Sequence, residues 1–182
     1  LEERRAKNRP FFHPSTLQPK LAGCMVNLTR IRPGEILLDP FCGAGAILME
    51  ASILGCIPIG IDISSRMIAG SRLNLEYFCR PPYHLSIGDA RRLPLRDVGA
   101  IATDPPYGRA ASTSGVELQS LYADFLNSAY DVLRPGGYLC IAGPDTLGVT
   151  YMGLEAGFIH VESHLMRVHG SLTREIAVFR RP

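Results

Sequence analysis

Two kinds of hydrophobic pattern alternate along this chain. Short apolar runs are followed by longer stretches in which apolar residues recur three or four positions apart. Runs of the first kind predict buried strands, and stretches of the second kind predict amphipathic helices. Strands are predicted over 35–38, 56–61, 84–87, 100–103 and 138–142. Helices are predicted over 18–28, 46–54, 66–77, 117–133 and 147–156.

Capping and turn residues predict where several of these elements begin and end. Ser15 or Thr16 is expected to cap the helix over 18–28, and Ser64 or Ser65 the helix over 66–77. The R-P-G-G sequence at 134–137 is expected to end the fourth helix before the next strand begins.

Strands that alternate with helices are typical of a parallel sheet with helices on both faces. The last two apolar runs, 158–168 and 175–180, depart from this alternation because the link through Gly170-Ser171 is too short for a crossover helix. The sequence therefore predicts an α/β fold with a seven-stranded, mostly parallel sheet and an antiparallel C-terminal hairpin. Residues 15–182 are expected to form one domain, preceded by a basic arm over 1–14.

Composition narrows the class of protein further. The chain has 182 residues, of which 46% are hydrophobic and 20% charged, and a net charge of +2. These values are typical of a globular domain and are weak evidence for a nucleic-acid partner. No apolar run approaches the roughly 20 residues of a spanning helix. With no signal-peptide pattern, we expect a cytoplasmic location, and because the first residue is Leu1 we expect a part of a longer protein. Five widely spaced cysteines predict neither disulfides nor a metal site.

Three of the predicted strands lead into residues that suit a nucleotide-like ligand. The first runs into D-P-F-C-G-A-G at 39–45, where glycines let the backbone approach a ligand closely. Leu48 stands where a dinucleotide fingerprint has its third glycine, which disfavours a nicotinamide cofactor. Asp62 is placed to hold ribose hydroxyls, and Asp89 to accept from an adenine amino group. Each aspartate alone is also typical of a helix cap or turn, but together they favour an adenosine-bearing cofactor.

The fourth predicted parallel strand ends in D-P-P-Y-G-R at 104–109. Its prolines have no N–H to donate, so the strand stops there and a stiff loop follows. Asp104 and the carbonyl of Pro105 can accept the hydrogens of an exocyclic amine on a nucleobase, and Tyr107 offers a ring on which an unstacked base can rest. Arg109 either contacts an RNA phosphate or closes the loop. With S-adenosylmethionine as cofactor, this loop predicts methyl transfer to an amine, mainly through positioning.

These motifs resemble a known family. N-R-P-F-F-H-P, D-P-F-C-G-A-G, G-I-D, G-D-A and D-P-P-Y-G-R follow the order of class I methyltransferases that act on exocyclic amines. The chain is similar to the tRNA guanine-N2 methyltransferases, and within them to the archaeal and eukaryotic guanosine-10 type. The resemblance implies a Rossmann-like fold and S-adenosylmethionine as cofactor. The implied catalytic residues are Asp104, Pro105, Pro106 and Tyr107. The implied cofactor-binding residues are Phe12, His13, Asp39, Phe41, Cys42, Gly43, Gly45, Asp62, Ile63, Asp89, Ala90 and Asp104. The implied substrate-binding residues are Tyr107, Gly108 and Arg109.

The resemblance also implies partners and leaves alternatives open. The substrate would be tRNA, full-length family members carry an N-terminal THUMP-containing RNA-binding region, and the eukaryotic type uses a small activating subunit. One or two methyl groups are both compatible with the sequence. Because D-P-P-Y is shared by adenine-N6, cytosine-N4 and guanine-N2 enzymes, a DNA or rRNA amino-methyltransferase is an alternative. A non-catalytic module that holds cofactor or tRNA is a second one.

Overall fold

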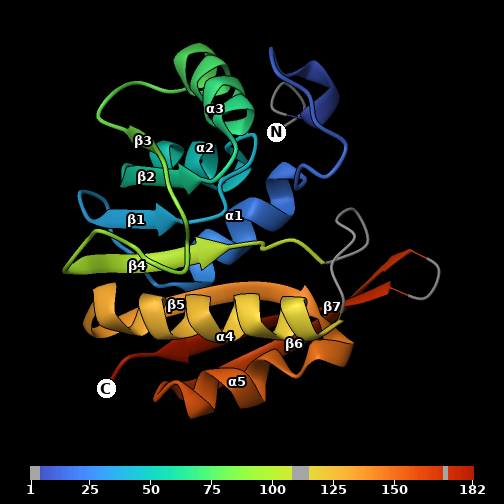
Figure 1. Cartoon of the computed structure of the whole chain (residues 1–182). Helices are drawn as coiled ribbons and strands as arrows, with labels where there is room; N and C mark the ends of the chain where they lie inside the picture. The colour runs from blue at the N-terminus through green and yellow to red at the C-terminus, as the bar shows by residue number, and fades with distance from the viewer. Residues whose placement is uncertain (1–4, 108–114, 170–171) are drawn as a thin grey trace.

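The computed structural model describes residues 5–107, 115–169 and 172–182. The seven strands in this part of the chain are β1 (Ile36–Asp39), β2 (Ile57–Asp62), β3 (His84–Ile87), β4 (Val98–Thr103), β5 (Leu133–Pro144), β6 (Ile159–His169) and β7 (Leu172–Arg180). They form one sheet in the order β3-β2-β1-β4-β5-β7-β6 (Figure 1). The helices are α1 (Pro19–Leu28), α2 (Ala46–Ile53), α3 (Ser65–Phe78), α4 (Gly115–Val132) and α5 (Val149–Glu155), with short 3₁₀ turns at Ala6–Asn8 and Asp145–Leu147.

The predicted fold class is confirmed. Strands β1 to β5 pair in parallel, so their carboxyl ends lie at one edge of the sheet. Strand β7 is antiparallel to both β5 and β6. Its first residues therefore return to the edge where the parallel strands end, although β7 is the last strand of the chain. The loops after β1, β2, β3 and β4 and the start of β7 meet at this carboxyl edge.

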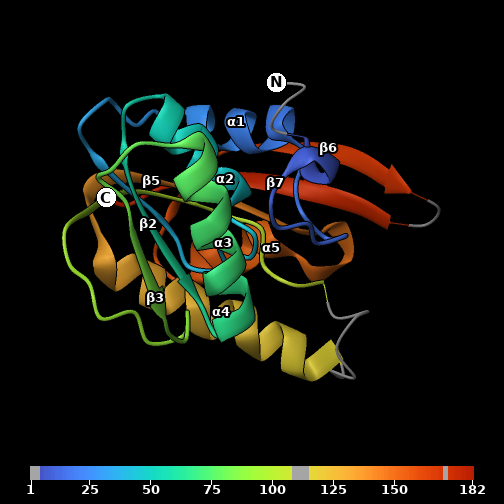
Figure 2. The ribbon, with the colours of Figure 1, turned by 90° about the horizontal axis from the view of Figure 1, so that it is seen from above.

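Apolar side chains fill both faces of the sheet. One cluster packs α1 and α2 against the sheet through residues such as Met25, Ile47 and Val178. A second cluster packs α4 and α5 on the opposite face, with Phe125 and Phe179 among its buried rings. The third joins α2 to α3. Figure 2 shows α1 and α4 on opposite sides of the sheet. The core thus holds the strand ends rigidly on both faces.

The helix starts differ in part from the sequence-based expectation. Ser64 caps α3 as predicted, because its side chain accepts a hydrogen bond from the backbone N–H of Met67. The prediction that Ser15 or Thr16 caps α1 is wrong. The helix begins at Pro19, and no side chain caps it. Proline fixes φ for the first helical position and needs no partner for a missing N–H.

The later strands extend further than predicted. Strand β5 begins at Leu133 and includes the R-P-G-G sequence, with a shift of register against β4 between Val98 and Ala100. A glycine at φ +75°, Gly136, lets the strand bend there rather than end. Strand β7 begins at Leu172 rather than residue 175, so Arg174 lies inside the sheet.

Candidate active site

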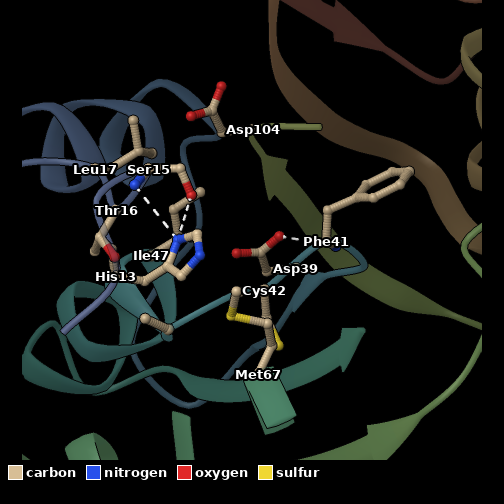
Figure 3. A pocket seen from close by; sticks show the side chains of 13 residues that line it. His13, Ser15, Thr16, Leu17, Asp39, Phe41, Cys42, Ile47, Met67 and Asp104 are labelled. Carbon is tan, nitrogen blue, oxygen red and sulfur yellow. Dashed lines mark hydrogen bonds between the residues drawn. The ribbon is translucent and has the colours of Figure 1, made fainter. Parts of the chain in front are cut away.

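A pocket opens at the carboxyl edge of β1 and β4 (Figure 3). Its lining comes from the arm before α1, the end of β1 and the loop that leads into α2, the first turn of α2, Met67 of α3, and Asp104 after β4. The lining residues are His13, Ser15, Thr16, Leu17, Asp39, Phe41, Cys42, Gly43, Ala44, Ala46, Ile47, Met67 and Asp104. The structure thus brings one predicted catalytic residue, Asp104, together with five predicted cofactor-binding residues of the β1 loop and the arm.

The loop from β1 into α2 has the backbone conformation that its glycines predict. Gly43 and Gly45 have φ values of +49° and +81°, in the region that side chains disfavour. A Cβ on Gly43 would meet only the Phe41 carbonyl, at 4.0 Å, so this glycine faces open space. A Cβ on Gly45 would lie 2.5 Å from the Ser71 hydroxyl of α3. Gly43 therefore leaves room beside the loop, whereas Gly45 allows α3 to pack closely.

Asp62 supports this loop from the end of β2. Its Oδ2 accepts from the backbone N–H of Gly43 at 2.9 Å, and its Oδ1 accepts from the N–H of Ser64 at the same distance. The carboxylate is thus fixed beside the glycine loop but does not line the pocket of Figure 3. Ile63, the next residue, is 73% exposed at the same edge.

Asp39 is a buried carboxyl group in the pocket wall. Only 2% of the residue is exposed, and its Oδ1 accepts from the Thr103 hydroxyl at 2.7 Å and the Phe41 N–H at 3.2 Å. Among the described residues, Oδ2 accepts no hydrogen bond. The pKa of Asp39 is raised to about 7, mainly because the group is buried; the hydrogen bonds from Thr103 and Phe41 lower the pKa, and the nearby charges of Asp62 and Asp104 add to the rise. Because its pKa lies near 7, a cationic ligand beside Asp39 would shift the group toward its ionised form.

Two predicted cofactor-binding side chains of this loop point away from the pocket. Figure 3 shows the Phe41 ring turned away from His13 and Asp39. The ring packs edge-on against Phe125 of α4, with ring centroids 5.2 Å apart. Cys42 is 4% exposed and belongs to the core cluster between α2 and α3, and burial raises the pKa of its thiol. These two residues therefore offer a ligand mainly their backbone groups.

The arm is tied to the body of the domain through Asn74 of α3. The Asn74 side chain accepts from the Phe11 N–H at 2.9 Å and donates to the Phe11 carbonyl at 3.0 Å. It also donates to the Ala44 carbonyl at 2.9 Å, so the arm and the glycine loop share one buried amide. His13 faces the pocket and contacts the Ser15 hydroxyl through Nδ1 at 2.7 Å. Phe12 is 54% exposed and lies outside the pocket lining.

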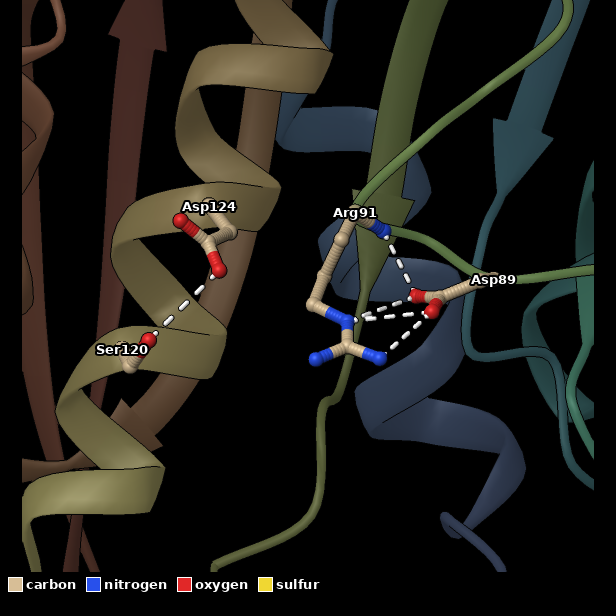
Figure 4. Close-up of polar contacts among 4 residues, drawn as sticks. All are labelled: Asp89, Arg91, Ser120 and Asp124. Atoms are coloured by element: carbon tan, nitrogen blue, oxygen red, sulfur yellow. Dashed lines mark hydrogen bonds and ion pairs between the residues drawn. The ribbon is translucent and has the colours of Figure 1, made fainter.

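Asp89 and Ala90 lie apart from this pocket. Figure 4 shows Asp89 paired with Arg91, whose Nη2 lies 2.7 Å from Oδ2 and whose backbone N–H donates to Oδ1 at 3.0 Å. The hydrogen bonds of Arg91 lower the pKa of Asp89. Ala90 is 3% exposed and packs in the core. A ligand amino group at Asp89 would have to share the carboxylate with Arg91.

The D-P-P-Y loop carries a polar cluster that sequence reasoning found only in part. The Tyr107 hydroxyl donates to Asp104 Oδ1. Arg174 of β7 donates to the Tyr107 hydroxyl from Nε at 2.5 Å and to Asp104 Oδ2 from Nη2 at 3.4 Å. Burial raises the pKa of Asp104, and the Arg174 charge acts against that effect. Two predicted substrate-binding residues, Gly108 and Arg109, lie outside the described residues.

Sequence reasoning missed four groups that shape this site: Arg174, Asn74, Thr103 and the Ser15–Leu17 segment. Thr103 could have been found, because a hydroxyl at a strand end beside Asp39 is a natural donor. Arg174 and Asn74 carried no local signal, because their roles depend on strand and helix packing across 70 and 63 positions in the sequence. Ser15 and Thr16 have the residue types of helix caps, yet both line the pocket and neither caps α1.

The order of the sheet, the glycine loop after β1 and the D-P-P-Y sequence after β4 are those of a class I methyltransferase domain. The chain belongs to the family described as RMKL-like, methyltransferase domain, whose model matches residues 6–176. This family and fold imply a cofactor of the S-adenosylmethionine type.

Curated relatives agree with this family. The chain is 45% identical over 178 residues to the tRNA (guanine(10)-N2)-dimethyltransferase of Methanothermobacter thermautotrophicus, covering 97% of this chain and 53% of that protein. It is 40% identical over 177 residues to the protein of the same name in Pyrococcus abyssi, covering 95% of this chain and 52% of the relative. The chain thus spans about half the length of these relatives.

Solved structures show the same fold. The crystal structure of TrmN from Thermus thermophilus superposes with a TM-score of 0.77 at 26% identity, over 93% of this chain and 50% of that one. A precorrin-6y C5,15-methyltransferase from Geobacter metallireducens superposes with the same TM-score at 13% identity, over 97% of this chain and 95% of that one. At that identity the likeness concerns the fold alone.

The described residues contain neither a metal-ligand cluster nor a membrane-spanning helix. No group of three or more His, Cys, Asp or Glu side chains in this part of the chain could hold a metal ion. None of the helices in the same residues is long and apolar enough to cross a membrane.

Proposed function

We propose that this domain transfers a methyl group from S-adenosylmethionine to the exocyclic N2 of guanosine 10 in tRNA. The observation that carries the proposal is that one pocket is lined both by the Asp39–Gly43 loop and by Asp104 of the D-P-P-Y motif. A methyl donor held by the first would face an amine held by the second. The names of the relatives at 45% and 40% identity supply the base and its position.

The charges around the pocket fit a cationic cofactor better than a phosphate-bearing one. Asp39, Asp62 and Asp104 lie close enough that the charges of the last two raise the pKa of the first. Such a field repels pyrophosphate and attracts an ammonium or sulfonium group. The open space beside Gly43 fits a ligand passing along the loop. Asp39 would hold the ammonium end, Asp62 the ribose hydroxyls and Asp89 the adenine amino group.

The remaining cofactor contacts come from the arm and the strand ends. We assign Phe12, His13, Gly43, Ile63 and the backbone at Phe41 and Cys42 to this role. Residues 1–14 would then act as an arm that closes one side of the cofactor site, consistent with the contacts of Phe11 and His13. Gly45 and Ala90 would contribute by packing, since neighbouring protein atoms fill the space around each of them.

When bound, S-adenosylmethionine supplies a methyl group already activated for transfer to a nucleophile. The exocyclic amine of guanine is a poor nucleophile because its lone pair is delocalised into the ring. Asp104 and the Pro105 carbonyl would accept the two amine hydrogens and so favour a tetrahedral nitrogen. The nitrogen loses one proton as it gains the methyl group, and Asp104 would accept that proton before it passes to solvent. Tyr107 would support the base after its hydroxyl leaves Asp104 Oδ1. One ring face of Tyr107 carries the Arg174 guanidinium, 5.3 Å from the centroid, so the base would use the other face.

Several finer points belong to the same proposal. The archaeal relatives are named dimethyltransferases, so we extend it to a second methyl group on the same nitrogen. The chain spans about half the length of these relatives. We therefore assign most of the affinity for tRNA to an RNA-binding region outside these residues or to a small partner subunit. The expected location is the cytoplasm.

Transfer of labelled methyl groups tests the proposal. The full-length protein containing this chain is incubated with labelled S-adenosylmethionine and a tRNA transcript, and the product is identified by nucleoside mass spectrometry. A matched transcript with inosine at position 10 lacks only the N2 amino group. Methylated guanosine in the first transcript and none in the second is expected. Asp104→Ala should lower the rate about 100-fold or more and leave the affinity for S-adenosylhomocysteine within about twofold.

Other outcomes separate the alternatives. Equal labelling of the inosine transcript, or labelling of duplex DNA or rRNA instead of tRNA, would overturn the assignment of the base. Binding of S-adenosylhomocysteine by the full-length protein without transfer to any of these nucleic acids would indicate a non-catalytic module.

A further inference from the structure

We propose that Arg174 is a positioning residue of the methyl-transfer site, whose guanidinium holds the Asp104 carboxylate and the Tyr107 side chain in the arrangement that receives the amine. This inference rests on the proposed function and adds to it a residue from outside every motif that the sequence analysis used. Arg174 comes from β7, 70 positions after Asp104.

The geometry of the three side chains is that of a fork with two partners. Nε of Arg174 donates to the Tyr107 hydroxyl at 2.5 Å, and Nη2 donates to Asp104 Oδ2 at 3.4 Å. The Tyr107 hydroxyl donates in turn to Asp104 Oδ1, which closes the ring of contacts. A planar guanidinium suits this arrangement because its N–H groups point in fixed directions.

The support behind Arg174 is rigid. The residue lies opposite Pro144 of β5 and Met166 of β6, inside the antiparallel part of the sheet. Its side chain is 10% exposed and that of Asp104 is 15% exposed. Because both partners are largely out of water, their mutual attraction is little screened. The C-terminal hairpin therefore sets the position of a loop that follows β4.

Charge gives the contact a chemical consequence. An ionised Asp104 offers both carboxylate oxygens to the amine hydrogens, whereas a protonated carboxyl group is a weaker acceptor and donates a hydrogen from one of its oxygens. Burial favours the protonated form, and Asp39 at the end of β1 is a second acid nearby, with a charge of the same sign when it is ionised. Tyr107 and the buried Tyr122 face Asp104 as hydroxyls whose pKa values are raised, so they remain neutral. His13 lines the same pocket. The Arg174 charge acts against burial and so favours the ionised form of Asp104.

Arg174 also provides a hydrogen bond for the Tyr107 hydroxyl when the substrate amine displaces that hydroxyl from Asp104. The Tyr107 hydroxyl occupies Asp104 Oδ1, so the amine has to displace it. A hydroxyl stranded in a buried site would cost free energy. Because the hydroxyl also accepts from Arg174 Nε, it keeps one hydrogen bond when its own donor is displaced.

The test titrates Asp104 directly. Aspartate labelled with ¹³C is followed by NMR from pH 3 to pH 9 in the wild-type protein and in Arg174→Gln, with Asp104→Asn to assign the signal. The midpoint of Asp104 is expected to rise by about one unit or more in Arg174→Gln. Arg174→Lys should restore most of the midpoint by its charge. Arg180→Gln, an exposed arginine on the same strand, is the matched control and should leave the midpoint unchanged.

Methyl transfer to tRNA provides the second readout. The acid limb of the pH–rate profile should move to higher pH in Arg174→Gln, together with the NMR midpoint. Arg174→Lys should keep the wild-type limb but lose about tenfold in rate, because an ammonium lacks the planar fork. Affinity for S-adenosylhomocysteine should stay within about twofold in both variants. A role only in folding would move neither the limb nor the midpoint.

Each result decides the question. An unchanged midpoint and limb in folded Arg174→Gln would overturn the inference. If Arg174→Gln does not fold, Arg174→Lys decides: a wild-type rate contradicts the fork, and a lower rate with unchanged cofactor affinity supports it. Absence of transfer by the wild-type protein would refute the proposed function. This outcome can be told apart from a failure of the inference about Arg174, because the NMR midpoint of Asp104 still reports the effect of Arg174.

Discussion

The buried acid at the end of β1 predicts that cofactor binding releases a proton. Asp39 has a pKa of about 7 in the free protein, because burial opposes its charge. A ligand ammonium at Oδ2 would stabilise the ionised form and lower that pKa toward its ordinary value. Binding below pH 7 therefore includes deprotonation of Asp39, and affinity should fall as the pH falls.

The magnitude follows from the fraction of Asp39 that is ionised before binding. About half of the molecules carry the charge at pH 7 and about one in a hundred at pH 5. The dissociation constant for S-adenosylhomocysteine should thus rise about 50-fold between pH 7 and pH 5. Isothermal titration calorimetry in buffers of different ionisation enthalpy measures both the affinity and the protons released. About half a proton is expected at pH 7 and nearly one at pH 5.

Two variants isolate the contribution of Asp39. In Asp39→Asn the Thr103 hydroxyl and Phe41 N–H keep an oxygen acceptor, so the loop should stay in place. The affinity of Asp39→Asn for S-adenosylhomocysteine should be lower than that of the wild-type protein at pH 7 and nearly independent of pH. His13→Gln removes the imidazole on the facing wall and should keep the wild-type dependence. A flat profile in the wild-type protein, or an unchanged slope in Asp39→Asn, would refute the reasoning.

Two further predictions concern the framework of the site. Gly45→Ala should lower the free energy of unfolding by about 2–4 kcal/mol, because it adds a clash with the Ser71 hydroxyl to a positive φ. Gly34→Ala has a similar φ of +85° and open space around it, so urea denaturation should show a loss of only about 1–2 kcal/mol; equal losses would contradict the clash. Asn74→Ala strips partners from three backbone groups and should cost about 3 kcal/mol, with weaker cofactor binding. Asn27→Ala, which removes one exposed bond, should cost under about 1 kcal/mol, and a similar loss in both would count against this role for Asn74.

Local patterns were sufficient for the order and type of the elements. Strand ends, helix periods and the short final link each depend on neighbouring residues, and these predictions are confirmed in β1 to β4 and in the antiparallel β7. The start of β5 was missed because R-P-G-G is a strong turn signal. Leu133 nevertheless pairs with Val98 of β4, and the backbones of Gly136 and Gly137 hydrogen-bond to Arg181, just after β7. Tertiary pairing decided what local preference could not.

The candidate site was predictable only where chemistry lies in a contiguous motif. The loops at Asp39 and Asp104 were found, and they do line one pocket. The direction of a side chain was not predictable from the sequence. The Phe41 ring turns into the core because Phe125 of α4, the helix on that face of the sheet, packs against it. The role of Arg174 depends on the register of β7 against β5, which no spacing in the sequence encodes.

The position of β7 has a consequence for how the protein is made. Strand β7 is the last element of the chain, yet it lies between β5 and β6. During synthesis from the N-terminus, β6 is made before the strand that joins it to the sheet. The Arg174 contact forms only when this insertion is complete. A nascent chain that already carries the D-P-P-Y loop therefore lacks the finished acceptor until its final strand has been inserted.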